Sequence, residues 1–251
     1  MENVRAKKIL GQHFLTDIHI AESICNLLDR NTKKVVEIGP GMGVLTQFLI
    51  KKYQTKLIEI DKESIIYLRK KWSDLNIIEG DFLVQDLNQI MKSKFSLIGN
   101  FPYNISNQIL FKTFENKQKI NELVGMFQKE VAERIVCKRG KKRGILSVLI
   151  QTYYNTEYCM TVPACVFHPK PKVESAVIKL VRNDRKELFV DENKYLKIIK
   201  SAFNQKRKTI KNALKKIFIL DCSSIKDLLN LRAEELSVED FIKLTKHVKQ
   251  Y

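Results

Sequence analysis

An amide, an aromatic residue, a proline and a second aromatic follow one another at 100–103, one glycine after the apolar stretch 95–98. Methylating an aromatic amine is difficult because its lone pair is delocalised into the ring. Two acceptors aimed at the amine hydrogens, the Asn100 side-chain oxygen and the Phe101 carbonyl, would draw that lone pair toward a methyl donor. Pro102 would fix the turn, and Tyr103 would stack on the base. The alternative is a plain turn after a strand, with the tyrosine in the core.

Three glycines follow a second apolar stretch, in the segment Glu37-Ile38-Gly39-Pro40-Gly41-Met42-Gly43. Their spacing differs from the G-x-G-x-x-G pattern of dinucleotide sites. Glu37, two residues before the first glycine, would repel a pyrophosphate but suits a cationic amino-acid group. S-adenosylmethionine has a sulfonium and an ammonium and no phosphate, so the segment predicts contacts to it from Glu37, Gly39 and Gly41. The alternative is that the glycines only make a tight turn.

Acidic residues also end the next two apolar stretches. Glu59 lies where a carboxylate usually accepts from both hydroxyls of a ribose. Asp61 is expected to cap the following helix. Asp81 could accept from the adenine amino group, and Phe82 either packs on that ring or belongs to the core.

Strands that alternate with helices would position these residues. The patterns predict strands at 34–38, 56–61, 75–78 and 95–98, and helices at 17–30, 44–52 and 64–71. They further predict a strand at 123–128, a helix at 129–136, strands at 147–154 and 174–181, and only helices over 194–248. This order indicates an α/β fold with a Rossmann-like parallel sheet, whose carboxyl edge gathers the residues above. We expect a cofactor-binding domain at 1–183 and a helical domain at 184–251.

The charge balance is strongly basic. Lys and Arg total 45 against 28 Asp and Glu, which gives a net charge of +17 and favours an extended polyanion as partner. Solubility or a lysine-rich genome is the alternative explanation. Two stretches concentrate the cations, and we expect them to contact RNA phosphates unless each is merely a solvated face: Lys138, Arg139, Lys141, Lys142 and Arg143, then Lys206, Arg207, Lys208 and Lys211.

Other features exclude several classes. The five cysteines are scattered without a CxxC pair, and the four histidines lack metal-ligand spacing, so neither a zinc site nor a disulfide framework is expected. There is no run of 18 apolar residues and no signal-peptide pattern, so we expect a protein of the reducing cytoplasm.

Six segments resemble motifs of the ribosomal RNA adenine N6,N6-dimethyltransferase family, and together they span nearly the whole chain. They are NFPYNIS at 100–106, GQHFL at 11–15, FQKEVAER at 127–134, FHPKPKVES at 167–175, NQKRKT at 204–209 and RAEELS at 232–237. The helix at 128–134 and the two C-terminal motifs resemble the housekeeping KsgA type, which acts on small-subunit RNA. The macrolide-resistance type, which acts on large-subunit RNA, matches them less well.

The resemblance implies a class I S-adenosylmethionine-dependent methyltransferase sheet with a small C-terminal all-α domain. It implies that Tyr103 and Phe167 sandwich the target adenine. Two positions differ from the family pattern: His13 stands where asparagine is usual, and Phe101 replaces leucine without loss of its carbonyl. The implied cofactor contacts are His13, Leu15, Gly39, Glu59, Asp81 and Asn100.

The activity that the resemblance implies is dimethylation of N6 on two adjacent adenosines near the 3′ end of 16S rRNA during ribosome biogenesis. The expected partner is the small ribosomal subunit, and the expected state is a monomer. Three alternatives remain: a large-subunit enzyme of the macrolide-resistance type, a DNA adenine methyltransferase, and a non-catalytic ribosome-assembly factor. The single proline disfavours the second, whose sites resemble D/N-P-P-Y. The intact acids and the segment 100–103 disfavour the third.

Overall fold

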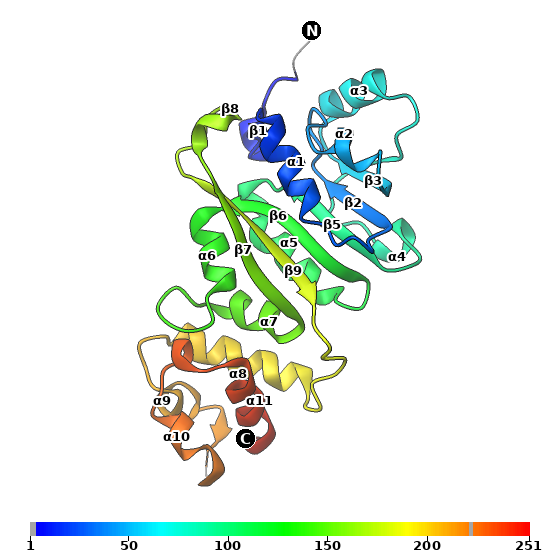
Figure 1. Cartoon of the computed structure of the whole chain (residues 1–251). Coiled ribbons are helices and arrows are strands. Elements are labelled where there is room, and N and C mark those ends of the chain that lie inside the picture. The colour runs from blue at the N-terminus through cyan, green and yellow to red at the C-terminus, as the bar shows by residue number, and fades with distance from the viewer. Residues whose placement is uncertain (1–3, 221–222) are drawn as a thin grey trace. The chain divides into compact units, whose positions relative to one another are not determined.

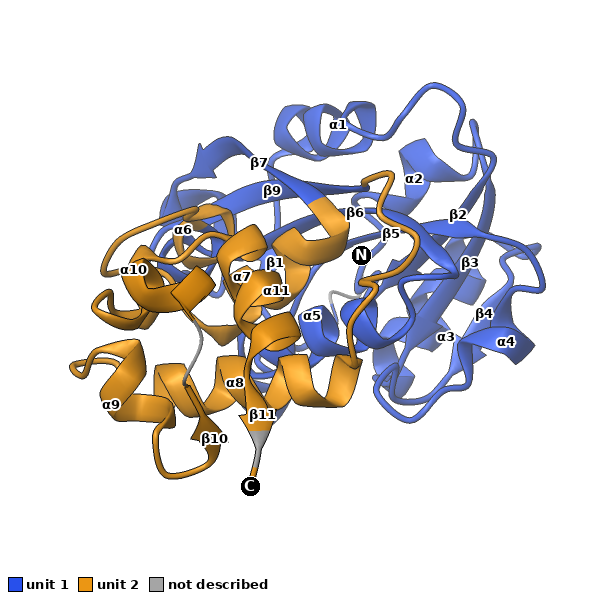
Figure 2. Cartoon of the chain, turned by 90° about the horizontal axis from the view of Figure 1, so that it is seen from below, with its two compact units in different colours: residues 1–132, 155–182 blue, residues 133–154, 183–251 orange. Residues whose placement is uncertain are grey.

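The computed structural model describes residues 4–220 and 223–251, which divide into two compact units (Figure 2). The first unit contains residues 1–132 and 155–182, and the second contains residues 133–154 and 183–251. The sequence predicted one boundary near residue 183. The second unit also takes in residues 133–154, an excursion between two strands of the first unit.

A seven-stranded sheet forms the first unit, in the order β4-β3-β2-β5-β6-β9-β7 (Figure 1). The five strands from β4 to β6 pair in parallel, and β9 pairs antiparallel with β6. The strands are β2 (Lys34–Ile38), β3 (Gln54–Glu59), β4 (Ile77–Glu79), β5 (Phe95–Asn100), β6 (Ile120–Gln128), β7 (Tyr154–Val162) and β9 (Ser175–Arg182). The expected α/β fold with a Rossmann-like sheet is confirmed.

The order of the strands creates a switch point beside β2. The chain passes from β2 outward to β3 and β4, then returns to place β5 on the other side of β2. Loops that leave β2 and β5 at their carboxyl ends therefore run in opposite directions. In open parallel sheets, ligands bind in the crevice that this divergence produces.

Helices cover both faces of this sheet; Figure 2 shows α1 (Ile18–Asn26) on one face and α5 (Ser106–Glu115) on the other. The expected cap of α1 is present, because Asp17 accepts hydrogen bonds from the backbone N–H groups of His19 and Ile20. The buried side chains of α1, such as Ile24, share a core cluster with Val35 and Ile98 of the sheet.

Shorter elements complete the first unit. The helices are α2 (Thr46–Leu49), α3 (Lys62–Lys71), α4 (Leu87–Ile90) and α6 (Lys129–Val136), the last of which continues into the second unit. Single turns of 3-10 helix lie at η1 (Lys8–Leu10), η2 (Tyr103–Ile105) and η3 (Ala164–Val166). The two-residue strands β1 (Phe14–Leu15) and β8 (Phe167–His168) pair antiparallel.

The prediction of a strand at 147–154 is wrong. Residues Ile145–Tyr153 form helix α7, and the strand β7 begins only at Tyr154. Nearly every side chain of α7 is buried, so the helix shows no polar face. A short apolar run that is buried on all sides has the same pattern in a helix and in a strand.

The second unit is mainly helical, as expected, but it also contains one short antiparallel pair of strands. Its remaining elements are α8 (Glu192–Asn204), α9 (Ile210–Leu214), β10 (Phe218–Ile219), η4 (Ser223–Ile225), α10 (Lys226–Leu229), η5 (Ala233–Glu235), α11 (Val238–His247) and β11 (Lys249–Gln250). Among the described residues of both units, no helix has the length and apolarity needed to cross a membrane.

Candidate active site

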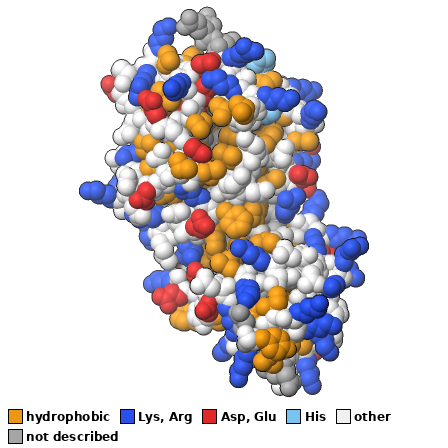
Figure 3. Space-filling model, turned by 180° about the vertical axis from the view of Figure 1, so that it is seen from behind, with side chains coloured by type: hydrophobic (Ala, Val, Ile, Leu, Met, Phe, Trp, Pro, Cys, Tyr) orange, Lys and Arg blue, Asp and Glu red, His pale blue; other side chains and the backbone are white. Residues whose placement is uncertain are grey.

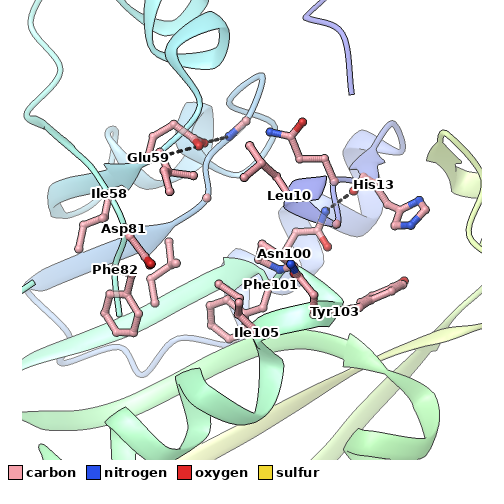
Figure 4. A pocket seen from close by; sticks show the side chains of 18 of the residues that line it. Leu10, His13, Ile58, Glu59, Asp81, Phe82, Asn100, Phe101, Tyr103 and Ile105 are labelled. Atoms are coloured by element: carbon pink, nitrogen blue, oxygen red, sulfur yellow. Dashed lines mark hydrogen bonds between the residues drawn. The ribbon is translucent and has the colours of Figure 1, made fainter. Parts of the chain in front are cut away.

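A cavity of about 250 Å³ opens at the carboxyl edge of the sheet (Figure 4). Its lining comes from five segments: 10–14 of the N-terminal region, 38–41 after β2, 58–60 at β3, 80–82 after β4, and 100–105 after β5. These segments contain the glycine turn, both strand-end acids and the Asn-Phe-Pro-Tyr sequence. Parallel strands thus bring together residues that lie far apart in the chain.

The turn after β2 needs its glycines. Gly39, Gly41 and Gly43 have φ angles of 64°, 54° and 79°, which side chains rarely adopt. A Cβ atom on Gly41 would lie 2.8 Å from the Phe14 ring. The backbone of this turn therefore approaches the cavity with no side chain in between.

Glu59, at the end of β3, is buried and hydrogen-bonded to backbone. Its Oε1 accepts hydrogen bonds from the N–H groups of Ile60 and Asp61, both at 2.9 Å, and its Oε2 accepts one from Gly41 at 3.0 Å. Burial raises the pKa of Glu59 and these hydrogen bonds oppose the shift. The carboxylate joins β3 to the glycine turn on the cavity wall (Figure 4).

Asp81 and Phe82 line the same cavity from the loop after β4. The Oδ1 atom of Asp81 accepts a hydrogen bond from the Leu83 N–H at 2.8 Å, which holds the carboxylate at the start of this loop. The Phe82 ring is 3% exposed, so it serves the core as well as the cavity wall. The two interpretations of Phe82 are thus compatible.

Asn100 has a defined amide orientation. Its Nδ2 donates to the backbone oxygen of His13 at 2.7 Å, across 87 positions of sequence (Figure 4). Because the nitrogen is committed to that carbonyl, the Oδ1 atom is the side-chain group that can accept from a substrate. This orientation suits an acceptor for an amine.

The turn after Asn100 is built on a buried ring. Phe101 is 1% exposed and meets Phe127 edge-on, with 5.1 Å between ring centroids. A Cβ atom on Gly125 would lie 2.2 Å from this ring, so the glycine of β6 makes room for a phenylalanine here. The Pro102 carbonyl accepts from the N–H of Ile105 at 3.2 Å and closes the turn.

Tyr103 and His13 stack against each other at the cavity rim, with 5.3 Å between ring centroids and 30° between planes (Figure 4). The Tyr103 hydroxyl shares a 2.6 Å hydrogen bond with Ser175 Oγ, and burial raises the pKa of this phenol. His13 Nδ1 donates to the Pro169 carbonyl oxygen at 2.6 Å. The histidine that replaces the usual asparagine therefore contacts the aromatic residue proposed to hold the base.

Sequence reasoning missed the network that holds the N-terminal segment. Gln12 Nε2 donates to Asp61 Oδ2 at 3.0 Å, and the Lys7 ammonium pairs with the same carboxylate. Asp61 also caps α3, as expected, by accepting from the Glu63 N–H. The motif at 11–15 was the only signal for this network, and it did not indicate which acid Gln12 would contact.

Three expected site residues do not reach the wall of the main cavity. Glu37 is 1% exposed, accepts a 2.7 Å hydrogen bond from Thr46 Oγ1, and lines only a smaller neighbouring cavity together with Leu15. The side chains of Leu15 and Phe167 are 3% and 4% exposed and belong to a core cluster. The Phe167 ring is packed into the core and does not line the main cavity, so the expected sandwich of an adenine between Tyr103 and Phe167 stays a prediction.

Burial also changes the titration of Glu37. It raises the pKa of this carboxyl from its ordinary value of 4.5 to about 8; the Thr46 hydrogen bond opposes the shift and the Glu59 carboxylate adds to it. A nearby cation would favour the ionised form. The acid lies directly below the glycine turn, beside Gly39 in the smaller cavity.

The prediction that Arg143 contacts phosphate is wrong. Its side chain is 1% exposed, and its guanidinium donates to the carbonyl oxygens of Lys138 and Leu236 within the second unit. A buried charge needs such partners, so the arginine organises this loop instead of facing solvent. Lys142 is exposed but pairs with Glu133.

The two basic stretches meet inside the second unit. The Lys206 ammonium donates to the carbonyl oxygens of Lys141 and Arg143 and pairs with Glu234 at 3.4 Å. Lys206 is thus partly committed to structure. Figure 3 shows Lys and Arg side chains widely spread over one face of the molecule. The remaining expected contacts are exposed: Lys138, Arg139, Lys141, Arg207, Lys208 and Lys211.

The mostly parallel seven-stranded sheet, with a glycine turn after β2 and acids after β3 and β4, defines a class I methyltransferase, a class that uses S-adenosylmethionine. A dimethyladenosine transferase from Plasmodium falciparum has this fold, with a TM-score of 0.78 at 24% identity, over 92% of this chain and 96% of that chain. The pattern of the family described as ribosomal RNA adenine dimethylase matches residues 3–250. The chain belongs to this family.

Curated relatives extend over the same length. The ribosomal RNA small subunit methyltransferase A of Cytophaga hutchinsonii is 52% identical, covering 98% of each chain. That of Bacteroides thetaiotaomicron is 51% identical, covering 100% of this chain and 96% of its own. The expected family is confirmed, and these two relatives are named for the small subunit.

Proposed function

We propose that this protein transfers methyl groups from S-adenosylmethionine to N6 of two adjacent adenosines near the 3′ end of 16S rRNA, dimethylating each during ribosome biogenesis. The observation that carries this proposal is the orientation of Asn100, whose Nδ2 is bound to the His13 carbonyl and whose oxygen is therefore the free acceptor. An oriented acceptor beside an acid-lined cavity suits the methylation of an amine.

The chemistry of the cavity fits the proposed cofactor. The carboxyl groups of Glu59 and Asp81 suit, as acceptors, a ribose diol and an adenine amino group, and they disfavour a phosphate-bearing cofactor. The backbone at Gly39 leaves room, since a Cβ there would meet its nearest neighbour only at 4.0 Å. We propose these residues, with Gly41, Phe82 and His13, as the cofactor contacts. When bound, S-adenosylmethionine supplies an electrophilic methyl group on its sulfonium.

The protein would act on the target mainly by positioning it. The Asn100 oxygen and the Phe101 carbonyl accept the two amine hydrogens and direct the lone pair out of the base plane. Pro102 holds the turn, and Tyr103 stacks on the base. The amine proton leaves to water after transfer, so the site needs no general base.

The small subunit is the favoured substrate over the large subunit, because both relatives named above cover the chain end to end and carry the small-subunit name. We propose that the protein works as a monomer in the cytoplasm, where ribosomal subunits are assembled. Exposed cations of the second unit, among them Arg207, Lys208 and Lys211, would track RNA phosphates.

Methyl transfer to purified subunits tests this function. Immature small subunits, large subunits, naked 16S rRNA and DNA are each incubated with the protein and S-adenosylmethionine bearing a deuterated methyl group. We expect labelled N6,N6-dimethyladenosine in the small-subunit sample only, detected by mass spectrometry of nucleosides. The Asn100→Ala variant serves as the catalytic control.

Three outcomes would contradict the proposal in different ways. Labelling of large subunits would indicate an enzyme of the macrolide-resistance type, which acts on large-subunit RNA. Labelling of DNA would indicate a DNA methyltransferase. Tight binding of small subunits without any label would leave a non-catalytic assembly factor.

A further inference from the structure

The Lys112 ammonium, on α5, is surrounded by three backbone carbonyls of the loop after β4. Its Nζ donates to the backbone oxygens of Phe82 at 2.8 Å, Leu83 at 2.9 Å and Gln85 at 2.6 Å. An ammonium has three donors, so this arrangement uses all of them. The same nitrogen lies over the Phe82 ring, 5.0 Å from its centroid.

The loop that Lys112 holds is the one that forms one wall of the main cavity. Asp81 and Phe82 line the cavity, and the Asp81 carboxylate is bound to the Leu83 N–H in the same turn. Burial lowers the pKa of Lys112, and the Asp81 carboxylate opposes that shift by favouring the charged form. The ammonium therefore supports the turn on which both cavity residues are carried.

The helix that carries Lys112 begins at the catalytic segment. Ser106, the first residue of α5, donates from its Oγ to the Pro102 carbonyl at 3.1 Å. The first turn of this helix thus contacts the turn proposed to hold the target amine. About two helical turns later, Lys112 of the same helix hydrogen-bonds the loop after β4. The hydrogen bonds of Lys112 join α5 to the loop after β4.

We propose that Lys112 is a positioning residue for the adenine end of the cofactor, holding Asp81 and Phe82 in place from α5. This inference rests on the proposed function, in that the cavity must take S-adenosylmethionine. Lys112 itself does not touch the cofactor. Its loss frees the loop, which must then be ordered again each time that a ligand containing adenine binds.

The test compares two lysines that make the same kind of contact. Lys119 Nζ also donates to backbone carbonyls, those of Met91 at 3.4 Å and Lys92 at 3.1 Å, and neither of these residues lines the cavity. Calorimetry measures the affinity of wild type, Lys112→Met and Lys119→Met for S-adenosylhomocysteine and for adenosine. We expect Lys112→Met to weaken both by a similar factor, about tenfold, and Lys119→Met to leave both unchanged.

Further measurements separate positioning from general stability. At saturating S-adenosylmethionine, Lys112→Met should methylate small subunits at close to the wild-type single-turnover rate, so that the loss appears in KM and not in kcat. Lys112→Arg, which keeps the charge and several donors, should recover part of the lost affinity. If Lys112→Met does not fold, Lys112→Gln and Lys119→Gln are compared in the same way.

Equal affinities of the paired Lys112 and Lys119 variants would overturn the inference, as would a loss confined to kcat. A wild-type protein that binds neither S-adenosylmethionine nor its product would instead overturn the proposed function. The two failures are therefore distinguishable in one set of titrations.

Discussion

The Asn100 side chain is oriented at the end of β5 by a hydrogen bond from its Nδ2 to the His13 carbonyl oxygen. If its oxygen accepts from the reacting amine, Asn100→Ala should lower the single-turnover rate at saturating cofactor by about 100-fold, comparable to the loss of one oriented transition-state hydrogen bond. RNA affinity should change little. A near-normal rate would make Asn100 a turn residue only.

Glu59 offers a test with a built-in control. If its carboxylate accepts from the ribose hydroxyls, Glu59→Gln should weaken S-adenosylhomocysteine binding by about 1–3 kcal/mol, the cost of leaving buried polar groups poorly paired. Wild type should bind adenosine more tightly than 2′,3′-dideoxyadenosine, and the variant should lose this preference. Because the carboxylate also accepts from the Gly41 N–H, thermal stability should be measured alongside. A preserved preference in the variant would remove Glu59 from the ribose site.

Glu37 predicts a pH-dependent stability. Burial raises its pKa from 4.5 to about 8, so between these values the folded protein retains a proton that the unfolded chain releases. Its contribution to stability is therefore complete below pH 4.5 and is lost as the pH rises to about 8. Urea unfolding of wild type and Glu37→Gln over this range should show wild type declining more steeply than the variant, by up to about 1.4 kcal/mol per pH unit. Parallel profiles would mean that Glu37 is ionised in the fold.

At the scale of elements, the contact between β5 and β6 sets the catalytic turn. Gly125 of β6 leaves space for the Phe101 ring, which a Cβ atom would approach to 2.2 Å. Gly125→Ala should therefore destabilise the fold by about 1–3 kcal/mol and reduce methylation, because the ring and the carbonyl of Phe101 must shift together.

A second substitution should reverse the effect of Gly125→Ala. At position 101 the family pattern has leucine, which is smaller than phenylalanine. Phe101→Leu removes ring atoms from this space, so Gly125→Ala combined with Phe101→Leu should recover stability and rate relative to Gly125→Ala. Denaturant titration and single-turnover rates measure both. Additive losses in the double variant would show that the two positions are independent.

At the scale of the whole molecule, the exposed cations of the second unit give the sharpest prediction about RNA. Replacing Arg207, Lys208 and Lys211 by glutamine should make the slope of log K against log salt concentration shallower by about 2–3, since each phosphate contact contributes about 0.7–0.9. Lys206 is left out because it pairs with Glu234 and with backbone carbonyls.

A control variant with the same change in charge keeps this test specific. Lys33, Lys92 and Lys94 are exposed beside the amino ends of β2 and β5, and they belong to the first unit. Their replacement by glutamine should leave the salt slope of small-subunit binding unchanged. Equal slopes in all three proteins would indicate that Arg207, Lys208 and Lys211 lie on a solvated face and do not contact RNA phosphates.

Local chemistry was enough to predict much of the first unit. Asp17 and Asp61 cap their helices as expected, and the three glycines after β2 have the positive φ angles that only glycine adopts easily. The acids at the ends of β3 and β4 meet at one edge because parallel strands end at the same edge of a sheet. Each of these features depends on a few neighbouring residues or on strand direction, so each can be predicted without a structure.

Other features depend on long-range contacts and on burial, which only the folded chain shows. Arg143 is buried although it lies in a run of cations, α7 is a helix although its run of apolar residues fits a strand, and Phe167 is packed into the core. Lys112 contacts a loop about 30 positions away, and Asn100 contacts a backbone oxygen 87 positions away. Such partners leave no periodic pattern in the sequence, because they depend on which segments the folded sheet brings together.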